Sequence, residues 1–168
     1  MSTWLELANN LKRHFRSDYL TPTQETARNS LCQWLYTPEW INLYGPHGAG
    51  KTFVAWAVAR ATGATYVPVP EQLSDLRPNH EGLIVDNAPY EEIEVRNVLS
   101  DCGLLNCYSV VLVTRRSVSM PMQRVELCLP SRDEIGMACR TLARLSYVCD
   151  VTMLPGQPTY WDIIAACI

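Results

Sequence analysis

Short apolar runs alternate with amphipathic segments along most of this chain. Runs with the length and aliphatic content of buried strands lie at 40–44, 65–69, 82–87, 108–114 and 125–129. Apolar residues that recur every three or four positions predict helices over 3–17, 23–36, 51–62, 91–105, 131–145 and 159–168. In the helix over 91–105, the inward positions are expected to be Ile93, Val98 and Leu99. This order of strands and helices favours an α/β fold with a central, mostly parallel sheet between helical layers.

The composition fits a single globular domain. The chain has 168 residues, of which 48% are hydrophobic, and this is enough to bury a sizeable core. The net charge of −3 provides no overall attraction to nucleic acid or to an anionic membrane. The longest apolar runs are strand-sized, and the first residues mix charges at helical spacing, unlike a signal peptide. We therefore expect no membrane span and a cytoplasmic location.

The cysteines form no C-x-x-C pair and lie mostly among apolar neighbours. This pattern favours buried free thiols in a reducing cytoplasm over a metal site or a disulfide framework. The seven positions are 32, 102, 107, 128, 139, 149 and 167.

The first apolar strand runs directly into Gly-x-x-x-x-Gly-Lys-Thr and then into a helix. This order is typical of a P-loop, the Walker A motif, whose glycines let backbone N–H groups point at phosphates while the helix presents its positive amino end. Lys51 would reach the β- and γ-phosphates, and the hydroxyl of Thr52 would bind Mg²⁺. The predicted ATP-binding residues are Gly45, Pro46, His47, Gly48, Ala49, Gly50, Lys51, Thr52 and Phe53.

An acidic residue closes the strand over 82–87. Three aliphatic residues precede Asp86, which lies about 35 residues after Lys51. The spacing is that of a Walker B element, whose carboxylate lies at the carboxyl edge of the sheet and holds Mg²⁺ through water. Asp86 and Thr52 are therefore the predicted metal-binding residues.

These motifs in this order resemble the AAA+ ATPases, and most of all the branch that contains the replication initiator DnaA, its homologue Hda, and the helicase loaders and transposition helpers related to DnaC and IstB. The resemblance covers roughly residues 20 to 145 and is most specific at 41–52 and 83–87. It implies a three-layer P-loop ATPase with three segments. These are two amino-terminal helices that pack on the core (1–39), the ATPase core (40–130) and an abbreviated helical lid (131–168).

The resemblance also implies roles for residues outside the two Walker motifs. Thr114 falls at sensor 1, which orients the water that attacks the γ-phosphate; the alternative is an ordinary β-branched strand residue. Arg124 falls near the arginine finger, which completes the site of a neighbouring subunit. Arg115 and Arg116 are competing candidates for the finger or for contact with a partner, and a solvated or structurally paired arginine is the alternative for each.

Two departures from the family pattern bear on catalysis. Asn87 follows the Walker B aspartate where the family usually has an acid, and its amide can orient water but cannot accept a proton. Hydrolysis is therefore expected to be slow, unless Glu91 or Glu92 supplies the base. No arginine follows Pro155, so the sensor 2 residue is not placed, and Arg140 and Arg144 are the remaining candidates.

The main functional hypothesis is a minimal ATPase that acts as an ATP-dependent switch with a protein or protein–DNA partner, in a nucleotide-dependent homo-oligomer. Contact with DNA would be indirect or would use the basic face of the first helix, formed by Lys12, Arg13, His14 and Arg16. One alternative is a small P-loop kinase, whose lid arginines would be Arg132, Arg140 and Arg144. The other is a nucleotide-binding scaffold subunit with little hydrolysis.

Overall fold

The computed structural model describes residues 4–78, 80–150, 152 and 154–167. Its five strands form a single sheet in the order β2-β3-β4-β1-β5, and every neighbouring pair is parallel. The strands are β1 Trp40–Tyr44, β2 Thr65–Val67, β3 Gly82–Val85, β4 Ser109–Thr114 and β5 Gln123–Glu126. The predicted α/β fold with a parallel sheet is confirmed.

Helices connect and flank these strands. They are α1 Trp4–Arg13, α2 Pro22–Trp34, α3 Lys51–Thr62, α4 Glu92–Leu104, α5 Arg132–Arg144 and α6 Tyr160–Ala166, with 3₁₀ turns at Ser17–Tyr19 and Pro70–Asp75. The helix predicted over 3–17 ends at Arg13, and the strand predicted over 65–69 ends at Val67, directly before Pro68. Within the described part of the chain, no helix has the length and apolar character that crossing a membrane requires.

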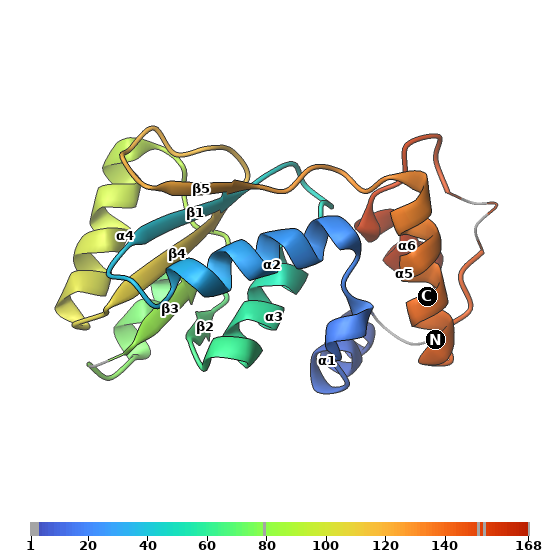
Figure 1. Ribbon diagram of the computed structural model, residues 1–168, viewed down its shortest axis with the longest axis horizontal. Helices are drawn as coiled ribbons and strands as arrows, with labels where there is room; N and C mark the ends of the chain where they lie inside the picture. Colours follow the sequence, from blue (N-terminus) through green and yellow to red (C-terminus); the bar gives the residue numbers. More distant parts are fainter. Residues whose placement is uncertain (1–3, 79, 151, 153, 168) are drawn as a thin grey trace.

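Alternate strand residues face opposite sides of the sheet, and each side is covered by helices (Figure 1). Ile84 and Val111 belong to the core under α2 and α3. Leu83 and Leu112 belong to the core under α4. The sheet is thus the middle of three layers, and it holds the carboxyl ends of β1, β3 and β4 along one edge.

One inward position of α4 is wrong in the sequence prediction. Val98 and Leu99 are buried, but the side chain of Ile93 is 69% exposed. Val95 faces the core instead, because the buried stripe of this helix is set by the three- and four-residue spacing of 95, 98, 99 and 102.

A third apolar cluster lies at the end of the molecule where α5 and α6 pack together (Figure 1). Leu7 and Leu11 of α1 contribute to it together with Ile135 and Leu142 of α5 and Ile163 of α6. The first helix therefore packs against the two last helices, whereas α2 packs on α3. The division into segments 1–39, 40–130 and 131–168 stays a prediction.

The carboxylate of Glu134 joins two helix starts. One oxygen accepts a hydrogen bond from the backbone N–H of Thr23 at the start of α2 (3.0 Å), and the other accepts one from the N–H of Ser131 at the start of α5 (3.0 Å). Burial alone would raise the pKa of Glu134, but hydrogen bonds from Thr23 and Ser131 outweigh burial and lower the pKa to about 2. The buried carboxylate of Glu134 thus links the start of α5 to the start of α2 through hydrogen bonds.

The expectation of seven free thiols is wrong for two cysteines. Cys149, in the segment after α5, forms a disulfide with Cys167 at the end of α6, and the other five cysteines are free. No motif marks this pair, because the two positions are 18 residues apart and their apolar neighbours fit a buried thiol equally well. The chain folds back on itself after α5, and this brings them together.

We expect Glu134→Gln to lower the free energy of unfolding by about 1 to 3 kcal/mol at pH 7, because the amide nitrogen would face a backbone N–H donor. The pKa of Glu134 is lowered in the folded state, so its contribution is complete above about pH 4.5 and disappears as the pH falls towards about 2. Urea unfolding at pH 7, 4 and 2.5 measures this. Glu92→Gln, which breaks an exposed ion pair with Arg96, is the control. Equal losses in the two variants, or a loss that does not vary with pH, would contradict the assignment.

Candidate functional site

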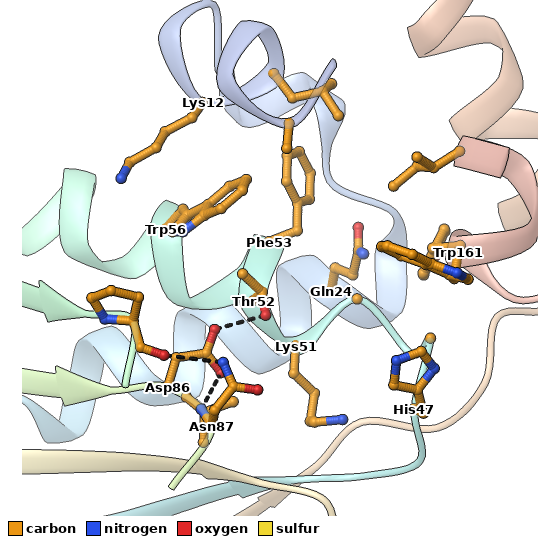
Figure 2. A pocket seen from close by; sticks show the side chains of 18 of the residues that line it. Lys12, Gln24, His47, Lys51, Thr52, Phe53, Trp56, Asp86, Asn87 and Trp161 are labelled. Atoms are coloured by element: carbon orange, nitrogen blue, oxygen red, sulfur yellow. Dashed lines mark hydrogen bonds between the residues drawn. The ribbon is translucent and has the colours of Figure 1, made fainter. Parts of the chain in front are cut away.

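A cavity of about 860 Å³ opens at the carboxyl ends of β1, β3 and β4. The loop after β1, residues 86–90 after β3, and residues 113–115 at the end of β4 form its floor. Side chains of α1, α5 and α6 form the opposite wall. Figure 2 shows the labelled residues that converge on this space from the two sides. Ligands of open parallel sheets bind at this edge.

The loop between β1 and α3 has the conformation that its glycines predict. Gly48 and Gly50 have φ angles of 79° and 83°, in the left-handed region that disfavours other residues. Gly50 is also the N-cap residue of α3, and together with Lys51 and Thr52 it lines the cavity, so the amino end of this helix faces the cavity. Backbone N–H groups of the first helical turn have no partner within the helix and attract anions.

Lys51 lies in the first turn of α3. Its ammonium donates hydrogen bonds to the carbonyl oxygens of Gly45 and Pro46, each at 2.8 Å. Burial lowers the pKa of Lys51 below its ordinary value; the charge of Asp86 opposes this shift, and the charge of Arg115 adds to it. Lys51 is therefore a half-buried cation that lines the cavity beside the loop.

Asp86 is the buried centre of the site, with 3% of its surface exposed. The hydroxyl of Thr52 and the hydroxyl of Tyr66 both donate to its Oδ2 atom at 2.7 Å, and the backbone N–H of Asn87 donates to Oδ1 at 2.8 Å. Thr52 and Asp86, which lie in two separate sequence motifs, are thus in contact, and their roles as Walker A and Walker B residues stay predictions. Tyr66 was not predicted, although its place on the strand next to Asp86 is a signal that could have identified it.

Asn87 lines the cavity, and its backbone is strained. Its φ angle is 50°, a left-handed value that asparagine tolerates better than most residues do. The side-chain amide donates to the carbonyl oxygen of Pro68 at 3.0 Å. The amide is thus already engaged by the segment that follows β2.

Thr114 ends β4 and is 2% exposed. Its hydroxyl donates to the carbonyl of Arg116 at 2.6 Å and accepts from the side-chain amide of Asn42 at 2.8 Å. Asn42 in turn accepts from the N–H of Val118 at 2.9 Å. Thr114 therefore lines the cavity and also holds the turn after β4, and its sensor 1 role stays a prediction.

The candidate arginine fingers lie in three different settings. Arg115 lines the cavity of its own chain. The guanidinium of Arg116 lies over the ring of Tyr90, 5.5 Å from its centroid. Arg124, on the edge strand β5, donates to the carbonyls of residues 118 and 120 at 3.0 Å and is not among the described residues that line the cavity.

The predicted lid arginines are not brought to the site. Arg132, Arg140 and Arg144 are absent from the described lining of the cavity, and Arg144 lies 3.6 Å from Asp18. Lys12 of α1 lines it instead, with its ammonium 5.6 Å from the ring centroid of Trp56 and 5.3 Å from that of Tyr66 (Figure 2). The sequence predicted Lys12 as part of a basic face that could contact DNA, because no local pattern reveals its approach to Trp56 of α3.

The start of α6 lies against the loop of residues 45–50 between β1 and α3, the predicted phosphate loop. The N–H of Tyr160 donates to the carbonyl of Gly48 at 3.0 Å, and its hydroxyl shares a hydrogen bond with that of Thr21 at 2.8 Å. Burial raises the pKa of Tyr160 to about 12; the bond to Thr21 opposes this rise, and the charge of Glu134 adds to it. The ring of Trp161 makes an edge contact with His47 at a centroid distance of 6.0 Å.

We expect Thr114→Val to lower the free energy of unfolding by about 1 to 3 kcal/mol, because it leaves an Asn42 N–H and the Arg116 carbonyl without their partner. Thr114→Ser keeps the hydroxyl and loses a buried methyl group, so it is the matched control. Urea unfolding of the three proteins measures the difference. A valine variant as stable as the serine variant would show that the hydroxyl does not hold this turn.

No protein-family model matches the sequence, and none of the curated proteins does. Solved structures do resemble the chain. A crystal structure of a DNA replication initiation factor has a TM-score of 0.52 and 15% identity over 80% of this chain and 54% of its own. AMPPCP-bound DnaA from Aquifex aeolicus has a TM-score of 0.50 and 17% identity over 86% and 60%. This chain spans little more than half the length of these proteins. It shares the fold of these two proteins.

Proposed function

We propose that this chain is a minimal ATPase of the AAA+ type, which binds Mg-ATP in the cavity and uses it as a switch for acting on, or assembling with, a protein or protein–DNA partner. The observation that carries the proposal is the 2.7 Å hydrogen bond from Thr52 to Asp86. It joins two motifs 34 residues apart at the amino end of α3, where a triphosphate needs a cation, backbone donors and a metal site together.

The loop residues Gly45 to Phe53 would surround the phosphates. The Lys51 ammonium would then donate to phosphate oxygens in place of the carbonyls of Gly45 and Pro46. Its internal hydrogen bonds would thus be replaced by charge-assisted bonds to the phosphates. The amino end of α3 adds its partial positive charge. The Aquifex aeolicus DnaA structure is bound to AMPPCP, and this supports a nucleotide in the matching cavity.

The residues beside the loop fit Mg²⁺. This ion prefers oxygen ligands, and the Thr52 hydroxyl and the Asp86 carboxylate are in contact at the edge of the phosphate site. Thr52 and Asp86 would hold the ion, and Tyr66 and the N–H of Asn87 keep the carboxylate in place. When bound, Mg²⁺ offsets the negative charge of the phosphates.

Hydrolysis is proposed to be slow. Asn87 and Thr114 would position water, but neither accepts a proton, and both side chains already donate to backbone carbonyls. Arg124 would stabilise charge in the site of a neighbouring copy. Its place on the edge strand, outside the lining of its own cavity, supports a homo-oligomer that forms with nucleotide.

A protein is the better supported partner. Tyr36 and Tyr108 are 70% and 53% exposed and flank a second cavity at the opposite edge of the sheet. Two of the four residues predicted to form a basic face for DNA are engaged elsewhere. Lys12 lines the cavity, and Arg16, which lies after the end of α1, has its Nε atom 3.1 Å from Oδ1 of Asp18. A cytoplasmic location stays part of the proposal because ATP is the substrate.

The scaffold alternative keeps one specific observation in its favour: the side-chain amide of Asn87 already donates to the carbonyl of Pro68. The kinase alternative needs arginines over the phosphates. The described lining contains none from α5, so this alternative has no comparable support.

We expect saturating Mg-ATP to stabilise the wild-type protein by about 2.7 kcal/mol at a hundred times Kd, and we expect no such effect in Lys51→Ala. Thermal unfolding with and without ATP measures this, with calorimetry for the affinity. Arg60→Ala removes a cation from the far end of the same helix and should respond like the wild type. No heat of ATP binding to the wild-type protein would remove the proposal.

We expect Asn87→Asp to raise the rate of phosphate release from ATP at least about tenfold, because an acid can accept the proton of the attacking water. Aspartate also tolerates the left-handed backbone at this position. It cannot donate to the carbonyl of Pro68, and the control variant shares this loss. Single-turnover phosphate release measures the rate, and Asn87→Ala is the control. An Asp variant no faster than the wild type would mean that the base lies elsewhere or that the chain is the hydrolysis-poor scaffold.

A further inference from the structure

The phosphate loop has a second layer of contacts on the side away from the sheet. An added Cβ atom at Gly48 would lie 2.5 Å from the Cβ of Thr159. One at Gly50 would lie 2.4 Å from Nε2 of Gln24 and 2.9 Å from Cδ2 of Tyr160. These glycines are therefore needed for the close approach of α6 as well as for their φ angles.

The contact between α6 and the loop is polar as well as steric. The backbone N–H of Tyr160 is bonded to the carbonyl of Gly48, and this bond adds to those that the Lys51 ammonium makes to the carbonyls of Gly45 and Pro46. The hydroxyl of Tyr160 is bonded to Thr21, the N-cap residue of α2. The side chain of Tyr160 thus links the loop to the N-cap of a second helix, so that the loop, α2 and α6 are fixed relative to one another.

We propose that the start of α6 is a positioning element for the phosphate loop: Thr159 and Tyr160 hold Gly48 and Gly50 in the conformation that points the loop amides at the phosphates. The phosphates as ligand rest on the proposed function, whereas the restraint that α6 places on the loop does not. Restraining a glycine-rich loop before binding removes conformational entropy that the ligand would otherwise have to overcome.

This arrangement predicts how the lid takes part in nucleotide binding without an arginine. The contacts of Thr159 and Tyr160 are to the loop and to Thr21, so they do not depend on a γ-phosphate. Loss of the element is therefore expected to weaken ATP and ADP by the same factor. The coupling is also reciprocal, so a change in the loop must loosen α6.

The first experiment compares the wild type with Tyr160→Ala by hydrogen exchange, without nucleotide, and by calorimetry with Mg-ATP and Mg-ADP. Amides of residues 45–52 are expected to exchange at least about tenfold faster in the variant, and both affinities to fall about tenfold. Tyr147→Ala is the matched control, because Tyr147 is a part-buried tyrosine of the same apolar cluster that bonds to Asn10 and is not among the described residues lining the cavity. Loop exchange equal to that of this control would overturn the proposal.

The nucleotide measurements separate the two hypotheses. If the wild type takes up no nucleotide, the proposed function fails while the exchange result still decides the role of α6. A loss for ATP without a loss for ADP would overturn the equal-factor expectation and make α6 a γ-phosphate sensor. Should Tyr160→Ala not fold, Tyr160→Leu, which keeps apolar bulk in α6, is judged by the same two readouts.

The reciprocal experiment changes the loop and reads α6. Gly48→Ala and Gly63→Ala place a methyl group at nearly the same φ angle, 79° and 76°, but only the first meets Thr159, whereas the second meets nothing within 4 Å. Faster exchange of amides 160–166 in Gly48→Ala alone is expected. Protected α6 amides in Gly48→Ala would overturn the coupling.

Discussion

The structure depends on how a single carboxylate, that of Asp86, is accommodated in a buried position. Transfer of an isolated carboxylate out of water is unfavourable by several kcal/mol, so it must receive hydrogen bonds. It receives them from Thr52 of α3, from Tyr66 of β2 and from the backbone that follows β3. Three elements that are distant in sequence are thereby drawn to one edge of the sheet. The phosphate loop lies at this edge because its strand, β1, is adjacent to β4 in the middle of the sheet.

Sequence alone was sufficient wherever a local pattern encodes a structural requirement. Gly48, Gly50 and Lys51 form a contiguous motif whose geometry follows from its own residues, and Asp86 ends a run of aliphatics that fits only a buried strand. The opposite wall of the cavity had no such pattern. Lys12 and Tyr160 reach the site because helices pack on it in three dimensions, and the spacing of residues along the chain does not encode those contacts.

Most of the remaining differences between the sequence predictions and the structure concern side chains that also form hydrogen bonds with the neighbouring backbone. Thr114 lies at the predicted place, yet its hydroxyl is shared with Asn42 and with the turn after β4, which a reading of strand ends does not reveal. Asn87 lies where the family resemblance leads to the expectation of an acid, and its amide is bonded to the carbonyl of Pro68. Glu134 caps its own helix and also α2. In each case a side chain satisfies neighbouring backbone groups, and this limits how far it can turn towards a ligand.

The disulfide between Cys149 and Cys167 closes a covalent ring that includes the whole of α6 and the residues that touch the phosphate loop. A helix of seven residues is too short to be stable by itself, so its docking relies on packing and on this ring. In a reducing cytoplasm the ring would open and leave packing alone. The thiol content of a buffer thus becomes a variable of every ligand titration on this protein, and samples prepared with and without reductant are chemically different molecules.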